Sequence, residues 1–218
     1  MEHRFLSREE QQIRDRLATL SETVEMAIDR ACDALASLDI SACEELVKND
    51  ENINKQQHVI EKEVLTTIAT QQPVATDLRI LVAALHISVE LERIADYAAG
   101  IARIIIKIAD EQPIAVGDDI LNMAESCKEM LTQAIQAYIA NDAELAVNIA
   151  KRDQQVDDYE TKLSNGIIEI ISKDAALVPF GSRLLWIVHA IERIGDRVTN
   201  ICEQIAYIKY AEVQDLNR

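Results

Sequence analysis

The chain repeats one short motif at a fixed distance, and this repetition constrains its fold more than any other feature. The first copy is 91–96 (Leu-Glu-Arg-Ile-Ala-Asp) and the second is 191–196 (Ile-Glu-Arg-Ile-Gly-Asp), an offset of 192 − 92 = 100 residues. A second pair of matching segments, 50–54 and 153–157, repeats at 153 − 50 = 103 residues. Self-similarity of this kind indicates an internal duplication, with a three-residue insertion between the matched segments.

Apolar residues recur at helical spacing along both halves, and few residues interrupt them. Five glycines and three prolines occur in 218 residues, and the aromatic share of 4% is low. Few helix breakers and few strand-forming residues favour long helices. We therefore expect an all-α fold of two tandem antiparallel three-helix units, residues 1–112 and 113–218, joined end to end or side by side.

Capping residues set the expected helix limits. A Ser or Asn followed by Glu three residues later predicts helix starts at Ser7, Ser41 and Asn141. The second helix ends before the next proline, and Thr76 or Asp77 would cap the third. The expected helices span 7–38, 41–72, 76–109, 118–140, 141–172 and 182–212, with a linker at 110–117 and a turn at 179–182.

The net charge of −16 narrows the classes of partner. Surfaces that bind nucleic acid are basic, so no nucleic acid is expected, and the charge does not indicate a phosphate-binding surface. It suits cations and basic protein partners. The four cysteines form no Cys-x-x-Cys pair and are expected to be reduced thiols of a cytoplasmic protein. No signal peptide is expected, and the apolar runs are too short for a transmembrane segment.

The repeated motif contains two acids four residues apart, and a matching pair precedes it in each half. Residues four apart share one face of a helix. The first set is Asp50, Asn54, Glu92 and Asp96, and the second set is Asp153, Asp157, Glu192 and Asp196. Where the helices that bear the two pairs are neighbours, the four side chains of each set face one groove.

Oxygen-rich sets of this kind suit hard or borderline cations. Carboxylates bind Mg, Mn, Fe or Ca well, whereas Zn prefers nitrogen or sulfur. A cation would also relieve the repulsion between clustered acids. The alternative is a solvated acidic helix face without a ligand, which a single Glu-x-x-x-Asp usually is. Two matched copies, each with a partner pair, favour a metal site.

The two sets differ in charge, and we expect the second to bind a metal better than the first. All four members of the second set are carboxylates. In the first set Asn54 replaces an acid, and Arg103 adds a positive charge that could pair with Glu92 and Asp96. That ion pair would compete directly with a bound cation.

Histidines and aromatic residues near the motif have both an ordinary and a functional interpretation. His58 and His189 lie close to the acidic stripes and could add nitrogen ligands. His86 lies off that face and is expected to be half-buried. Trp186 and Tyr97 neighbour apolar stripes, so we expect both to pack in the protein and not to act in recognition.

The arginine of each motif directly follows the glutamate. At about 100° per residue, Arg93 and Arg193 point away from the acidic stripe. We expect each to form an ion pair with a neighbouring helix. A docking contact with a partner protein is the alternative.

On these residues the chain resembles the PhoU family of accessory regulators of phosphate transport. The resemblance covers nearly the whole chain and rests on 72–79 (Gln-Pro-Val-Ala-Thr-Asp-Leu-Arg), on 92–96, and on 192–196 with Asn200. It implies two three-helix bundles related by pseudo-two-fold symmetry. It also implies that both acidic sets bind a divalent or trivalent metal ion: Fe, Mg, Mn, Ca or Zn.

The resemblance further implies a function. Members of the family repress the phosphate-starvation response when phosphate is plentiful, by contacting the ATPase subunit of the phosphate ABC transporter and a membrane sensor histidine kinase. The chain is therefore expected to be a non-enzymatic negative regulator and a homodimer. It would be cytoplasmic, and peripheral at the inner face of the membrane through its partners.

Two other classes of function are considered beside this one. A di-metal carboxylate enzyme would use helical acids, but it also uses Glu-x-x-His on inward-facing helices, a pattern that the sequence lacks. No Gly-rich phosphate loop and no catalytic triad pattern stands out either. The other class is a helical adaptor that binds no metal.

Overall fold

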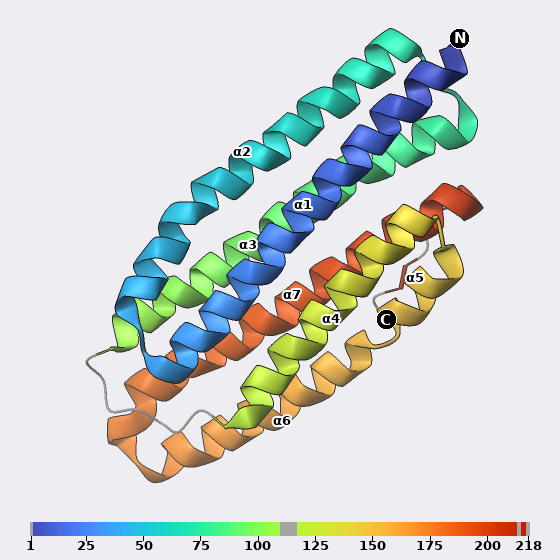
Figure 1. Ribbon diagram of the computed structural model, residues 1–218. Helices are drawn as coiled ribbons and strands as arrows, with labels where there is room; N and C mark the ends of the chain where they lie inside the picture. The colour runs from blue at the N-terminus through green and yellow to red at the C-terminus, as the bar shows by residue number, and fades with distance from the viewer. Residues whose placement is uncertain (1, 110–116, 213–214, 217–218) are drawn as a thin grey trace.

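The computed structural model describes residues 2–109, 117–212 and 215–216, and within them the chain is helical throughout, without strands. The elements are α1 (Glu2–Ser37), α2 (Ile40–Gln71), α3 (Ala75–Ile108), α4 (Asp118–Ala140), α5 (Ala143–Ala150), α6 (Asp153–Lys173), the 3-10 turn η1 (Ala175–Leu177) and α7 (Val178–Tyr210). The prediction of an all-α fold is confirmed (Figure 1).

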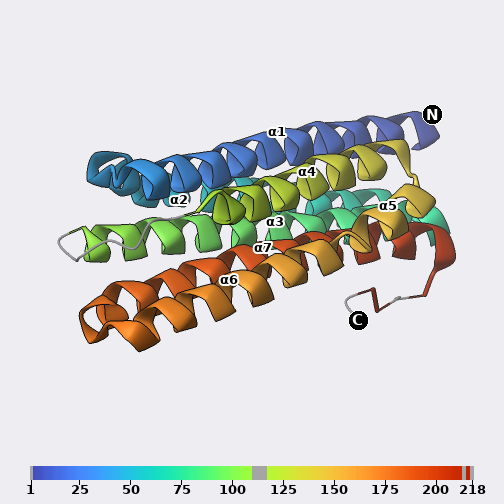
Figure 2. The ribbon, with the colours of Figure 1, turned by 90° about the horizontal axis from the view of Figure 1, so that it is seen from below.

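Two bundles lie side by side. The first consists of α1, α2 and α3; the second consists of α4, α7 and the consecutive helices α5 and α6, which together take the place of one helix. Between the bundles, α3 packs along α7 and α1 packs against α4. Figure 1 shows α2 and α6 at the two outer edges, and Figure 2 shows α3 and α7 side by side in the middle. The expected boundary between residues 112 and 113 lies outside the described residues.

The core follows from the apolar stripe of each helix. Leu17, Leu20 and Val24 of α1 are fully buried, as are Ile187 and Val198 of α7. Burying each such side chain contributes roughly 1.5–3 kcal/mol. The segment 175–210 is the one described stretch that is long and apolar enough to span a membrane by length and composition. In this fold the apolar stripe of the segment is buried in the core of the second bundle.

Two arginines link the bundles reciprocally. Arg79 of α3 donates from Nε to Ile208 O at the end of α7, at 3.0 Å, and Arg183 of α7 donates to Lys107 O at the end of α3, at 3.4 Å. The last carbonyls of a helix lack partners within the helix and bear partial negative charge. A guanidinium supplies both a hydrogen-bond donor and a positive charge to these carbonyls. The exchange of contacts is what a pseudo-two-fold relation between α3 and α7 predicts.

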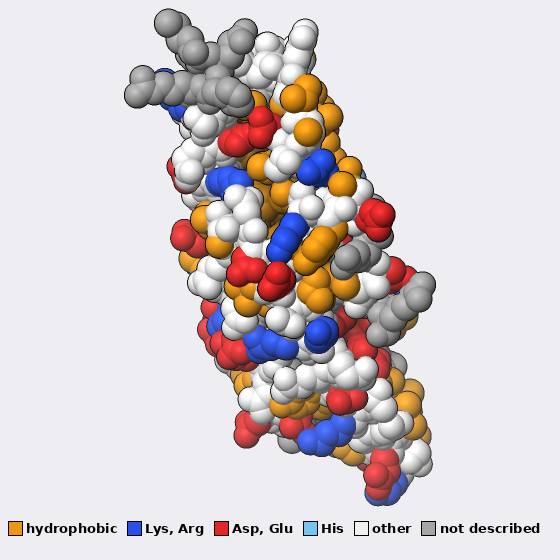
Figure 3. Space-filling model, turned by 90° about the vertical axis from the view of Figure 1, so that its right-hand side faces the viewer, with side chains coloured by type: hydrophobic (Ala, Val, Ile, Leu, Met, Phe, Trp, Pro, Cys, Tyr) orange, Lys and Arg blue, Asp and Glu red, His pale blue; other side chains and the backbone are white. Residues whose placement is uncertain are grey.

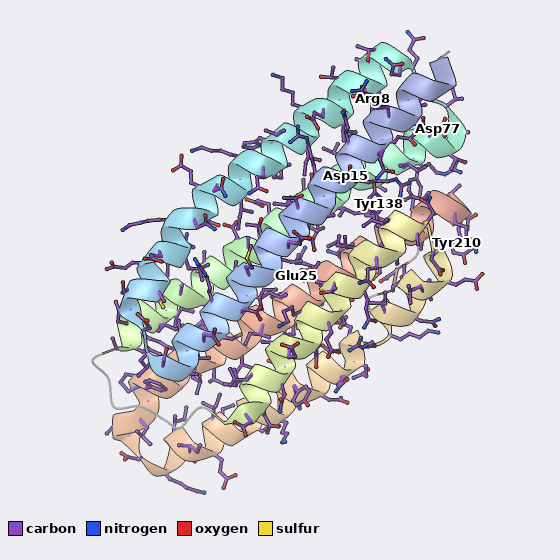
Figure 4. All side chains as sticks on the ribbon, in the orientation of Figure 1. Arg8, Asp15, Glu25, Asp77, Tyr138 and Tyr210 are labelled. Atoms are coloured by element: carbon purple, nitrogen blue, oxygen red, sulfur yellow. The ribbon has the colours of Figure 1, made fainter. Side chains whose placement is uncertain are left out.

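A third arginine joins α1 to α4. Arg14 is 9% exposed and donates to Tyr138 O at 2.9 Å, to Ile139 O at 3.1 Å and to Asn141 Oδ1 at 3.0 Å. Its guanidinium also lies 5.0 Å from the centroid of the Tyr138 ring. Figure 4 shows Tyr138 near the end of α4, beside α1. One side chain of the first bundle thus caps a helix of the second.

The expected starts of the first three helices are wrong by one to five residues. α1 begins at Glu2, so Ser7 lies inside the helix. α2 is capped by Asp39, whose carboxylate accepts from Ala42 N at 3.0 Å, and not by Ser41. α3 begins at Ala75, without a side-chain cap. In α2, Asp39 thus takes the capping position that the pattern gave to Ser41.

In the second half the helix limits differ more from those expected. Asn141 is the C-cap of α4, in a left-handed conformation (φ 54°), and not the N-cap of the next helix; Asp142 starts α5 by accepting from two backbone amides. The expected fifth helix is broken into α5 and α6 at 151–152. The expected turn at 179–182 is helical, because Pro179 lies in the first turn of α7, where a missing amide hydrogen costs little.

Candidate metal centre

The second acidic cluster lies where α6 packs against α7. α6 contributes Asp153 and Asp157, and α7 contributes Glu192 and Asp196. Asp153 and Asp196 are each only 7% exposed, Glu192 is partly buried, and Asp157 is exposed. The four carboxylates act on one another electrostatically, so the structure brings the predicted set of the second half together.

Burial and mutual repulsion make these carboxylates hard to ionise. Burial, followed by repulsion from Asp157 and Asp196, raises the pKa of Asp153 to about 6. Burial, followed by repulsion from Asp196, raises the pKa of Glu192 to about 7. The pKa of Asp157 is raised in the same way, by burial and then by Asp196. A cation beside these acids would stabilise their ionised forms.

Gly195 lets Asp153 approach α7 closely. A Cβ atom on Gly195 would lie 2.7 Å from Asp153 Oδ1 and 3.3 Å from Val156 Cγ1. The hydroxyl of Thr199, one turn further along α7, lies beside Asp153 and opposes the rise in its pKa. The small residue of the second motif therefore serves the acidic cluster as well as the helix packing.

Basic side chains already contact the second cluster. Arg193 forms an ion pair with Asp196, three residues along the same helix, and its Nε lies 3.8 Å from Glu192 Oε2. His189 Nδ1 lies 3.3 Å from the same oxygen. These contacts of Arg193 run along its own helix, whereas the sequence suggested an ion pair with a neighbouring one. His189 lies beside the cluster, where it could add a nitrogen ligand.

The first acidic cluster lies between α2 and α3 and consists of Asp50, Asn54, Glu92 and Asp96. Burial, followed by repulsion from Asp96 and Asp50, raises the pKa of Glu92. The pKa of Asp96 is raised by partial burial and then by Asp50. Arg103 Nη2 lies 3.3 Å from Asp50 Oδ2. The salt bridge that the sequence placed within α3 therefore reaches across to α2.

Three side chains near the clusters differ from expectation. His58 is largely exposed, and its imidazole lies near a glutamate of its own helix. His86 is exposed and not half-buried. Trp186 is 65% exposed and stands edge-on to His189, with 6.3 Å between ring centroids. Tyr97, by contrast, packs against the apolar core as expected.

Three oxygen atoms of the clusters are buried without a hydrogen bond: Asp50 Oδ1, Asn54 Oδ1 and Glu192 Oε2, the last of which has only the ionic contacts with His189 and Arg193. A buried oxygen without a donor costs free energy, and each of these belongs to a predicted ligand. This donor set of carboxylate and amide oxygens fits a hard cation. Among the described residues, no three His, Cys, Asp or Glu side chains already converge on one ion position. Metal binding therefore stays a prediction.

Glu90 is the charged residue that the motif analysis missed. Its carboxylate accepts from Arg93 of α3 at 3.2 Å, and from Arg197 and Asn200 of α7 at 3.3 and 3.2 Å. It thereby joins the two motif helices at the contact between the bundles. The repeat offset offered a signal, because the equivalent residue (90 + 100) is the uncharged Ala190.

The match to known families follows the two bundles. One family model, described as the PhoU domain, matches residues 17–105 and again residues 120–205. The chain belongs to the PhoU family. Each bundle corresponds to one PhoU domain, so the resemblance noted from the motifs is confirmed.

Relatives in the PhoU family match over almost their whole length. The chain is 32% identical to the phosphate-specific transport system accessory protein PhoU homolog of Clostridium acetobutylicum, over 95% of each chain. It is 32% identical to that of Streptococcus pneumoniae, over 91% of this chain and 92% of the relative. The accessory protein PhoU of Escherichia coli is 29% identical, over 93% and 83%. These relatives are named as accessory proteins of phosphate transport, not as enzymes.

Two solved PhoU structures have the same fold. The crystal structure of the phosphate transport system regulatory protein PhoU from Streptococcus pneumoniae superposes with a TM-score of 0.90 at 29% identity, over 96% of this chain and 99% of that one. PhoU from Pseudomonas aeruginosa gives 0.88 at 26% identity, over 94% and 99%. The helical architecture described above is thus that of the PhoU family.

Proposed function

We propose that this PhoU-family chain is a cytoplasmic regulatory protein of phosphate uptake that represses the phosphate-starvation response and does no catalysis. The observation that carries the proposal is that both bundles match the PhoU domain, and that relatives over nearly the full length are named accessory proteins of phosphate transport. The proposed partners are the ATPase subunit of the phosphate ABC transporter and a sensor histidine kinase at the membrane. The chain would act as a homodimer.

The partners are tested by affinity purification from phosphate-replete and phosphate-starved cells of the source organism. The expected result is recovery of the transporter ATPase and the kinase with the tagged chain, in amounts that differ between the two conditions. A Glu90→Gln variant is a control for bundle integrity, because it weakens the contact between the bundles without touching the acidic clusters. Recovery of neither partner from replete cells would contradict the proposal.

We further propose that both acidic clusters bind a metal ion. The support is the set of buried oxygens without donors and the raised pKa values of the surrounding acids. A bound cation would supply positive charge to the carboxylates and release Arg193 and Arg103 from them. The second cluster has four carboxylates, so it is the tighter site.

The difference between the clusters gives a direct test. Divalent metal titrated into the Asp196→Asn variant should bind several-fold more weakly than into Asp96→Asn, because the former loses a ligand of the four-carboxylate cluster. Isothermal titration calorimetry with Mn2+ measures both, with the unchanged chain as reference. Equal weakening in the two variants would contradict the asymmetry.

A metal-free helical adaptor is the second candidate function. The observation that favours it is that Arg193 and Arg103 already pair with carboxylates of the two clusters. Metal analysis of protein purified without chelator separates the two candidates. A metal content near zero that does not rise on incubation with Mn2+, Mg2+ or Fe2+ would favour the adaptor, whereas a stoichiometric content would exclude it.

A further inference from the structure

A pocket of about 480 Å3 opens between the two motif helices, α3 and α7. Its lining residues are Arg93, Asp96, Tyr97 and Arg103 of α3 and Arg197 of α7. Three guanidinium groups thus line one pocket beside one carboxylate, in a chain whose net charge is −16. Guanidinium groups gathered at one point of so acidic a protein suit an anionic ligand.

The arginines are held in place by carboxylates behind the pocket. Glu90 pairs with Arg93 and Arg197, and Asp50 pairs with Arg103. The side chains of Arg93 and Arg103 are about half exposed, and ion pairs that exposed are weak. Each guanidinium has five donors, so a pair with one carboxylate leaves donors for a second anion. The pairs orient the arginines without using up their binding capacity.

Arg197 shows that this capacity is unused. Its side chain is 20% exposed, and its Nε is buried without a hydrogen-bond partner. A buried donor without an acceptor is unfavourable, so the Arg197 side chain would gain by turning its guanidinium toward an acceptor in the pocket. This donor lies on the one pocket residue that comes from α7, so the ligand would touch both bundles.

We propose that the α3–α7 pocket binds an oxyanion of the phosphate or phosphate-ester class through Arg93, Arg103 and Arg197. Guanidinium forks match the oxygens of phosphate in shape and in charge. The volume leaves room beyond a single phosphate group for the remainder of an ester. The proposal does not depend on the function proposed above. The pocket shares Asp96 with the first acidic cluster, and Arg103 pairs with Asp50 of that cluster, so the binding test is made without metal.

Asp96 predicts which oxyanion is preferred. It is the one acid among the described residues that line the pocket. A phosphate that retains a proton can donate a hydrogen bond to this carboxylate, whereas sulfate has no proton at neutral pH and would be repelled. The pocket should therefore prefer phosphate to sulfate, although the two are similar in size and charge.

The test is calorimetric titration of the full chain at low ionic strength in EDTA, so that no metal mediates binding. Inorganic phosphate, AMP and sulfate are the three ligands. We expect a dissociation constant below about 1 mM for phosphate or AMP, and weaker binding of sulfate. Tighter binding of AMP would identify a phosphate ester, and tighter binding of phosphate the free anion; both support the proposal.

Variants assign the binding to the pocket. Arg197→Gln and Arg93→Gln should each weaken binding about tenfold or more. Arg16→Gln, an exposed arginine of α1 paired with Glu63, is the matched control and should bind as the parent does. Circular dichroism checks that each variant is folded. If Arg197→Gln is unfolded, the result with Arg93→Gln decides the test. No binding of phosphate or AMP at about 10 mM, sulfate binding as tight as phosphate, or equal loss in Arg16→Gln would each overturn the proposal.

Discussion

At the scale of single residues, the second acidic cluster depends on Gly195, because a glycine has no side chain that would fill the space taken by Asp153. Asp153 is buried against α7 because Gly195 leaves room for its carboxylate. The first half has Ala95 at the equivalent position and Asp50 at the position of Asp153. The two clusters therefore differ in backbone access as well as in charge, and both differences set the second cluster apart.

A Gly195→Ala substitution should destabilise the protein by about 1–2 kcal/mol. Alanine favours a helix over glycine by about 1 kcal/mol, but here its Cβ would collide with Asp153 and crowd Val156. Gly100→Ala is the matched control, because nothing lies within 4 Å of its Cβ, and it should stabilise the helix. Urea unfolding compares the two; equal effects would show that Asp153 moves aside without cost.

The stability of the metal-free protein should depend on the ionisation of the second cluster. The pKa of Asp153 (about 6) and of Glu192 (about 7) lies above the value in an unfolded chain, so the folded state binds these protons more tightly. The free energy of unfolding in EDTA should therefore fall by roughly 2 kcal/mol as the pH rises from 5 to 8.

A variant isolates this pH effect from other titrations. In Glu192→Gln the fall in unfolding free energy between pH 5 and 8 should be smaller than in the parent, because one of the two raised carboxyl groups is gone. Urea midpoints measured across the pH range give both curves. Parallel curves would show that Glu192 ionises in the folded protein without penalty.

The positions of the eight predicted ligands could be inferred from the sequence, but their partners could not. The repeat and the four-residue spacing predict which residues of each half share a helix face. The side chains of Arg193 and Arg103 are long and flexible, so spacing alone does not decide which carboxylate each one reaches. Trp186 was misjudged for a different reason: its helix position neighbours an apolar stripe, but no element covers that position.

At the scale of the helices, the two halves differ most in where the first acid pair lies relative to the start of its helix. α2 runs unbroken past Asp50, whereas the matching segment is divided, and Asp153 lies in the first turn of α6. A helix start bears partial positive charge, which favours a carboxylate there. The break has no signal in the sequence, since 151–152 contains neither proline nor glycine.

Helix ends at the bundle contact are stabilised by arginines, and Arg14 is the most buried of these. Arg14→Ala should lower the free energy of unfolding by roughly 2–4 kcal/mol, because three acceptors at the end of α4 lose their donor. Arg16→Ala, two residues along α1 and exposed, should change it by less than about 0.5 kcal/mol. Chemical unfolding measures the free energy of unfolding of both variants. An equal change in the two would show that the contacts of Arg14 with the end of α4 do not stabilise the protein.

At the scale of the whole molecule, charged and apolar groups are interspersed on the surface, as one side shows (Figure 3). The apolar area is instead used between the bundles, where α3 packs on α7 and α1 on α4. The sequence predicted two units but left their arrangement open, because no short motif records which helix faces meet. Buried faces of α3 and α7 meet there, so the bundles are not independent domains.

The two bundles should consequently unfold together. Core amides of the first bundle, such as that of Leu20, and of the second, such as that of Val198, should exchange with similar opening free energies. Native-state hydrogen exchange at increasing urea measures both. A second bundle that opens at clearly lower free energy than the first would show that the contact between them is weak.

The reciprocal contacts of Arg79 and Arg183 resemble those of a symmetric dimer more than those of two domains in one chain. In an isologous interface, residue i of one subunit contacts residue j of the other and the reverse contact follows. Here the α3–α7 contact has that form within a single polypeptide. Such an interface would form between two separate chains as well. Joining the halves in one polypeptide ensures that each first half has one second half as its partner, while each half is free to diverge in sequence. The unequal acidic clusters are what that freedom permits.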